Sequence, residues 1–159
     1  MNAAHLHLLV NHLPVILPPL GLLLLLCARL RGSDDIRQAA MGVFVLGALL
    51  AVPAYYSGEP AEERVEDLPG VAKSLIHEHE ESAEWAAGAI GILGVLAAPA
   101  LILLARRRRV PAPLRAAVLV AALLTAVVMG RTALLGGRIH HPEIREPAAS
   151  TPEARQAED

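Results

Sequence analysis

Four long apolar stretches constrain what this chain can fold into more than any other feature of its sequence. They span residues 6–28, 39–56, 85–105 and 114–135, and charged side chains are almost absent from them. A helix needs about 20 mostly apolar residues to cross the hydrocarbon core of a bilayer, so each stretch predicts one membrane-spanning helix. The hydrophobic content of 54% also exceeds that of ordinary soluble domains. We therefore expect an all-α integral membrane protein, a four-helix bundle in a lipid bilayer.

The third helix is expected to begin before its apolar part. Leu68-Pro69-Gly70 punctuates the chain, and the residues after it keep a helical composition, which predicts a helix over about 72–105. The Gly136-Gly137 pair is expected to end the fourth helix. A transmembrane domain over residues 1–146 would then be followed by a disordered tail over 147–159, which is rich in Pro and Ala and lacks periodicity.

The arginines predict how the helices are oriented. They crowd into the short connections after the first and third stretches, as Arg29, Arg31 and Arg37 and as Arg106, Arg107, Arg108, Arg109 and Arg115. By the positive-inside rule these connections are cytoplasmic, which puts both termini and the long connection between the second and third helices outside. Because the charges are sorted by position and the net charge is only -2, nothing in the sequence predicts nucleic-acid binding.

Each of the four predicted helices brings histidine or glutamate to this outer face. Ionisable residues at or inside the membrane are costly and typically serve ions, protons or cofactors. The candidate metal ligands are His5, His7, His12, Glu59, Glu62, His79, Glu80, His141 and Glu143. Their spacing does not match the H-E-x-x-H pattern of zinc peptidases. The sequence therefore predicts a metal site but no particular reaction, and whether the chain is an enzyme stays open.

The start of the first helix combines polar side chains with prolines. His12 lies inside the apolar run, and Pro14, Pro18 and Pro19 follow it, each removing a backbone donor and freeing a carbonyl. A distorted helix beside a ligand site is one interpretation. The alternative is that Asn11 and His12 only hydrogen-bond to these freed carbonyls.

Two further features lie in the third and fourth helices. Arg131 is a lone cation near the end of the fourth stretch, and we expect it to meet a carboxylate. Ala87, Gly91 and Gly94 form a stripe of small residues on the third helix. Such a stripe indicates close packing against a neighbouring helix more often than a flat cofactor.

Four segments together resemble a known family. They are HLHLLVNHLP at the start, SGEPAEE after the second helix, HEHEESAE into the third and GGRIHHPEIR after the fourth. They are similar to a family of small, functionally uncharacterised bacterial four-helix membrane proteins, over most of residues 1–146. A bacterial family, together with the orientation predicted from the arginines, implies an inner-membrane protein with its site on the periplasmic or extracellular side, and the resemblance supplies no reaction. It falls on His5, His7, Asn11, His12, Gly58, Glu59, Glu62, His79, Glu80, His141 and Glu143, whereas His77 and His140 stand where the family often has another polar residue.

The type of ligand favours a metal centre. Imidazoles and carboxylates in this number exceed what a tetrahedral structural zinc needs and match a dinuclear iron, copper or zinc centre. His7, His12, His79 and His141 would bind the metal, Glu59, Glu62 and Glu80 would bridge or orient, and Asn11 and Arg131 would hydrogen-bond to the ligands. A redox-active centre of this kind could work with a quinone partner.

Two other classes stay open. One is a b-type haem held by His12 with His79 or His141, with Arg131 near a propionate. The other is a non-catalytic accessory subunit of a respiratory or photosynthetic complex, or a homo-oligomer, that uses its polar face for contacts. A transporter is not favoured, because the centres of the helices contain no ionisable residues.

Overall fold

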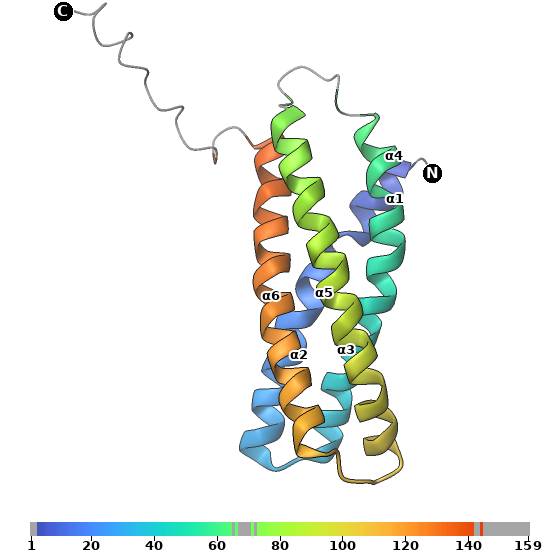
Figure 1. Cartoon of the computed structure of the whole chain (residues 1–159), viewed down its shortest axis with the longest axis vertical. Helices are drawn as coiled ribbons and strands as arrows, with labels where there is room; N and C mark the ends of the chain where they lie inside the picture. The colour runs from blue at the N-terminus through green and yellow to red at the C-terminus, as the bar shows by residue number, and fades with distance from the viewer. Residues whose placement is uncertain (1–2, 65, 67–70, 72, 142–143, 145–159) are drawn as a thin grey trace, which may run out of the picture.

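The computed structural model describes residues 3–64, 66, 71, 73–141 and 144, and it is a bundle of long helices (Figure 1). The tail predicted over 147–159 lies outside the described residues. Four candidate membrane spans are present: His5–Arg31, Asp34–Tyr56, Lys73–Ala105 and Ala112–Ile139. The prediction of an all-helical chain with four long apolar helices is confirmed. The helices are α1 (Ala3–Val10), α2 (His12–Arg31), α3 (Asp34–Tyr56), α4 (Gly58–Glu62), α5 (Lys73–Ala105) and α6 (Ala112–His140).

Different segments of the chain meet at the two ends of the bundle (Figure 1). The end that we call the histidine end contains α1, α4, the first turns of α5 and the last turns of α6. At the opposite end, the arginine end, the turn between α2 and α3 lies beside the loop between α5 and α6. The polar segments that the sequence predicts at one membrane face therefore lie at one end of the bundle.

The first span is broken at Asn11, where a single helix over 6–28 was expected. Pro14 has no N–H, and its ring clashes with the carbonyl four residues earlier, which belongs to Val10. α1 ends at Val10 for this reason, and α2 begins at His12. The Asn11 N–H still donates to the His7 carbonyl over 2.9 Å. Because of this break, α1 follows a different direction from α2 and packs against α3 and α4.

The prediction that Gly136-Gly137 ends the fourth helix is wrong. α6 continues through both glycines to His140. Glycine costs about 1 kcal/mol relative to alanine inside a helix, which packing of the last turn can offset. Ile139 in that turn is buried, and Gly136 lies against the His79 imidazole.

α3 begins five residues earlier than the apolar stretch that predicted it. The Ser33 side chain caps the helix by accepting the Ile36 N–H over 3.2 Å, and Asp34 and Asp35 place negative charge in the first turn. Gly32 precedes this cap with φ 63°, a left-handed conformation that favours glycine. The start of α3 is therefore determined by these capping residues and not by where the apolar stretch begins.

The bundle has a small-residue interior and an apolar exterior. Buried side chains include Phe44, Leu93 and Val118, packed among alanines. Large apolar side chains point outward, with Val95 75% and Val127 72% exposed. A soluble monomer seldom leaves so much apolar surface uncovered, whereas lipid is a suitable solvent for it.

Close approach between helices depends on two glycines. A Cβ placed on Gly94 of α5 would lie 2.4 Å from the Ala48 Cβ on α3, and one on Gly21 of α2 would lie 2.2 Å from the Phe44 ring. The packing role predicted for the small-residue stripe is thus found at Gly94. A Cβ on Gly91 would meet nothing within 4 Å, so the stripe is not one continuous contact.

Candidate functional site

His7 turns from α1 toward the end of α3. Its Nδ1 lies 3.1 Å from the Ala54 carbonyl oxygen and 3.3 Å from the Ser57 Oγ. Ser57 is buried, and its hydroxyl also donates to the Ala54 carbonyl over 3.1 Å. Because a carbonyl can only accept, the neutral imidazole donates from Nδ1 and keeps a lone pair on Nε2. The end of α3 therefore orients His7 with Nε2 available as a ligand atom.

His79 has the same arrangement on the other side of the bundle. Its half-buried imidazole reaches from α5 to α6, where Nδ1 lies 3.0 Å from the Thr132 carbonyl oxygen. A Cβ on Gly136, one turn later, would lie 3.0 Å from the His79 Cε1, so glycine leaves the space that this ring occupies. The main chain again binds Nδ1 and leaves Nε2 as an acceptor.

A buried pair of hydroxyls fixes α5 against α6 beside His79. The Ser82 and Thr132 oxygens are 2.8 Å apart, and both residues are buried. The Thr132 hydroxyl also lies 3.1 Å from the Ser82 carbonyl and 3.0 Å from the Val128 carbonyl. Buried polar groups that find partners in this way define helix register, because losing one leaves the other unsatisfied. The pair holds the Thr132 carbonyl where His79 meets it.

Glu62 and Glu80 bring two carboxyl groups together next to the histidines. Glu62 ends α4, and Glu80 lies on α5 next to His79 in sequence. Burial raises the pKa of the Glu62 carboxyl, and the neighbouring Glu80, which hydrogen-bonds to it, raises that pKa further. Two carboxylates this close repel each other when both are ionised. A cation placed between them would relieve the repulsion.

These four side chains lie close enough to interact electrostatically. His79 interacts with both His7 and Glu80, and Glu80 interacts with Glu62. We call His7, Glu62, His79 and Glu80 the His–Glu cluster. Over the part of the chain that the structure describes, no three His, Cys, Asp or Glu side chains are already arranged around a common point that could hold a metal ion. The cluster is a set of neighbours rather than a preassembled coordination sphere.

The other predicted ligands within the described residues are exposed. His12 is exposed, its Nδ1 lies 3.2 Å from the Leu8 carbonyl, and its charge interacts with that of His7. The carbonyl that His12 meets is thus not one of those freed by the prolines, which lie four residues before each proline. Glu59 is exposed and interacts with Glu62. His5 is exposed on α1, and His141 is exposed where α6 ends.

The remaining predicted residues are outside the cluster or outside the described residues. Asn11 is half-buried, and its Oδ1 has no hydrogen-bond partner among the described residues. Arg131 is exposed on α6, and the carboxylate partner expected for it is not found within the described part of the chain. Glu143 lies outside the described residues. His77 is exposed on α5, with Nδ1 4.0 Å from the Glu80 carboxylate.

Sequence reasoning missed the hydroxyl groups that support the two imidazoles. Ser57, Ser82 and Thr132 are all buried at the histidine end. One signal was present in the sequence, because Ser82 and Thr132 are polar residues within helices that are otherwise apolar on their buried sides. Polar residues of that kind commonly hydrogen-bond across helices.

Comparison of the chain with known protein families, with curated proteins and with solved structures found no match.

Proposed function

We propose that this chain is a multi-pass protein of the bacterial inner membrane with its histidine end on the outer side. Four apolar helices and an apolar exterior support membrane insertion. The arginine end carries the basic residues of both short connections, which the positive-inside rule assigns to the cytoplasm. Both termini are then on the outer side.

The length of α5 supports an accessible His–Glu cluster. Its 33 residues extend about 50 Å at 1.5 Å per residue, against about 30 Å of hydrocarbon. The first turns of α5, which carry His79 and Glu80, therefore stand at the headgroup level or beyond it. Ions in the outer solution can reach the cluster there without crossing lipid.

The function that this geometry supports best is binding of a divalent transition metal by the His–Glu cluster. One observation carries the proposal: both imidazoles bind a main-chain carbonyl through Nδ1 and keep Nε2 free. Metal-bound histidines typically donate their other ring N–H to a carbonyl or carboxylate in this way, which fixes the tautomer and the ring orientation. His79 interacts electrostatically with Glu80 of the carboxyl pair, whose two members repel each other when both are ionised.

The donor set indicates the class of metal. Two imidazole nitrogens with carboxylate oxygens suit zinc or iron, whereas Cu(I) prefers sulfur ligands. Cys27 cannot serve, because it lies near the end of α2 at the arginine end. His7, His79, Glu62 and Glu80 suffice for one ion. A second ion, as in a dinuclear centre, would also need ligands such as Glu59 and His12, which interact with the cluster.

Each residue has a defined part in this proposal. The Ala54 and Thr132 carbonyls orient the two imidazoles, and Gly136 leaves room for that of His79. Glu62 and Glu80 would supply carboxylate oxygens to the cation, and its charge would offset the repulsion between them. A bound ion of this class supplies Lewis acidity or, if iron, one-electron chemistry.

The test is metal binding by the full-length protein, purified without a histidine tag, stripped with a chelator and titrated with Co²⁺. Tetrahedral Co²⁺ absorbs strongly in the visible region, and elemental analysis gives the stoichiometry. We expect about one ion per chain. His7→Ala and His79→Ala should each lower affinity by about 10–100-fold or abolish binding.

The matched control is His77→Ala, which removes an imidazole from the same helix two residues from His79. The His77 side chain is 82% exposed and points to solvent, so its loss should leave binding within about threefold. Circular dichroism of each variant checks that the helices are retained. Equal binding by all three variants would refute the assignment.

Other outcomes of the same preparation identify the competing classes. About one iron per chain with a Soret band would replace the proposal by a b-type haem. Protein with neither metal affinity nor haem that copurifies with larger membrane chains would indicate an accessory subunit. Two ions per chain would extend the site to a dinuclear centre.

A further inference from the structure

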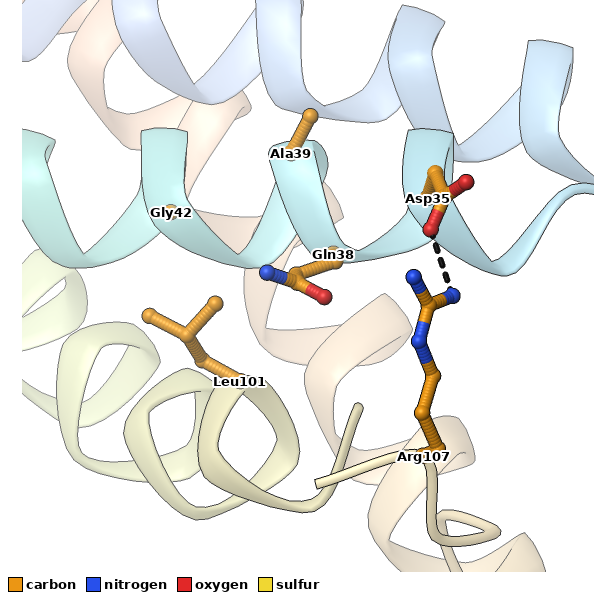
Figure 2. Close-up of a pocket in the computed structure, with 6 residues that line it drawn as sticks. All are labelled: Asp35, Gln38, Ala39, Gly42, Leu101 and Arg107. Atoms are coloured by element: carbon orange, nitrogen blue, oxygen red, sulfur yellow. Dashed lines mark hydrogen bonds and ion pairs between the residues drawn. The ribbon is translucent and has the colours of Figure 1, made fainter. Parts of the chain in front are cut away.

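The arginine end contains two adjacent hollows. The first, of about 410 Å³, lies between α3 and α5, and Asp35 and Arg107 line it together with Gln38, Ala39, Gly42 and Leu101 (Figure 2). The second, of about 430 Å³, shares Arg107 and lies between the start of α3 and the α5–α6 loop. We call the second hollow the arginine cavity, because five arginines line it: Arg37, Arg107, Arg108, Arg109 and Arg115.

The arginine cavity has a cationic rim and an apolar floor. Leu104 and Val110 also line it, and both are buried. All of its arginines except Arg37 are exposed. Arg115 donates to the main-chain carbonyl of Val110 over 3.3 Å, whereas the apolar side chains of the floor offer no acceptor to the other guanidinium groups.

The positive charge of the cavity is only partly balanced. Arg37 forms an ion pair with Asp34, and Arg107 with Asp35, whose Oδ1 lies 2.7 Å from the guanidinium (Figure 2). Arg108 and Arg109 have no carboxylate partner in the described ranges of the chain. Five guanidinium groups therefore face one lining carboxylate, that of Asp34.

We propose that the arginine cavity binds an anionic phosphate group, with a membrane phospholipid as the expected source. Guanidinium forks bind phosphate oxygens in pairs, and Arg108 and Arg109 both have donors to spare. The cavity lies where the apolar helices end, which is the depth of lipid headgroups. An apolar floor under a cationic rim fits an amphiphile better than a bare ion, and free phosphate shares the same recognition chemistry.

A bound phosphate differs from the diffuse attraction between basic residues and an anionic membrane. Diffuse attraction depends on the number of charges near the surface, whichever residues carry them. Arg29 and Arg31 are equally exposed at the same end of the bundle, on the last turn of α2, but they do not line the cavity. They provide a control of identical charge.

The experiment counts lipids bound to the full-length protein by native mass spectrometry during titration with phosphatidylglycerol or phosphatidylcholine. R108Q/R109Q should weaken binding of the first phosphatidylglycerol by at least about tenfold, the value of one charge-assisted hydrogen bond or more. R29Q/R31Q should change it by less than about threefold, the size expected for a screened surface charge. The other arginines of both connections stay, so topology signals are retained, and circular dichroism verifies helicity.

A second arm distinguishes the sources of the phosphate. The site would be assigned to a free phosphate if millimolar inorganic phosphate displaces phosphatidylglycerol from the wild type. Added phosphate should then also raise the melting temperature of the wild type but not that of R108Q/R109Q. Phosphatidylglycerol binding that resists inorganic phosphate would assign it to a lipid. Equal weakening of phosphatidylglycerol binding in the two double variants would overturn the proposal.

Discussion

Gly94→Ala and Gly91→Ala are the same substitution at two positions of α5, and the structure predicts opposite effects on stability. A methyl at position 94 would lie 2.4 Å from the Ala48 Cβ on α3. A methyl at position 91 would meet nothing within 4 Å. The pair therefore separates helix propensity, which both substitutions improve, from helix packing, which only one disturbs.

The magnitude follows from the contact at Ala48. Non-bonded carbons normally stay about 3.5–4.0 Å apart, so α3 and α5 would have to separate by about 1 Å or more. Ala48 has no rotatable side chain, so the backbone must move. Overpacking costs about 1–3 kcal/mol, and alanine returns about 1 kcal/mol of helix propensity. Because the separated helices also give up part of their van der Waals packing, we expect Gly94→Ala to lower the free energy of unfolding by about 1–2 kcal/mol. Gly91→Ala should raise it by up to about 1 kcal/mol.

Unfolding by SDS in mixed micelles, followed by circular dichroism, measures both effects. Ala48→Gly supplies the rescue, because it removes the opposing methyl. In the cycle of Gly94→Ala with Ala48→Gly we expect a favourable coupling of about 1–2 kcal/mol. The reasoning is refuted if Gly94→Ala stabilises the protein as much as Gly91→Ala does, or if the coupling is zero.

Three further predictions concern the α5–α6 loop and the histidine end. Arg107, the second residue after α5, has φ 54°, so Arg107→Gly should stabilise the protein by about 1 kcal/mol relative to Arg107→Ala in the same SDS assay. Burial and the Glu80 charge raise the pKa of Glu62, so its ionised form costs stability, a cost that is absent below the ordinary carboxyl pKa and complete above the raised one. Glu62→Gln should therefore stabilise the metal-free protein at about pH 7.5 but not at about pH 3.5, and an effect independent of pH would contradict this assignment. Gly136→Ala places a methyl 3.0 Å from an imidazole of the His–Glu cluster and should weaken Co²⁺ binding by about tenfold, whereas Gly137→Ala, which meets only Ile144 at 3.5 Å, should leave it unchanged.

The helices could be predicted because a bilayer requires apolar segments of a certain length, and that length can be read directly from the sequence. Their ends could not be predicted as well, since they depend on particular local and tertiary contacts. Ser33 begins α3 earlier than hydropathy indicates. Pro14 breaks the first span, and Gly136 stays inside α6 because an imidazole packs against it.

The meeting of polar residues at one end could be predicted from the order of helices and connections. Which of the histidines turn inward could not, because that depends on how each helix is rotated about its axis. His7 contacts α3, while His5 and His12, two and five residues away, are exposed. Because the helix is broken at Asn11, the direction of α1 and its rotation about its own axis cannot be predicted by extending the pattern of apolar residues in α2.

The two imidazoles of the cluster take their orientation from main-chain oxygens, and this has a consequence for how such a site can change over evolutionary time. Any residue at position 54 or 132 supplies the same carbonyl, so the groups that aim His7 and His79 survive substitution of the side chains that carry them. The site requires only the histidines, the small residues that leave space for them, and the same arrangement of the helices. Related chains could therefore share the site with little identity between them, and a search for them should use the spacing of histidines and glycines along helices rather than overall similarity.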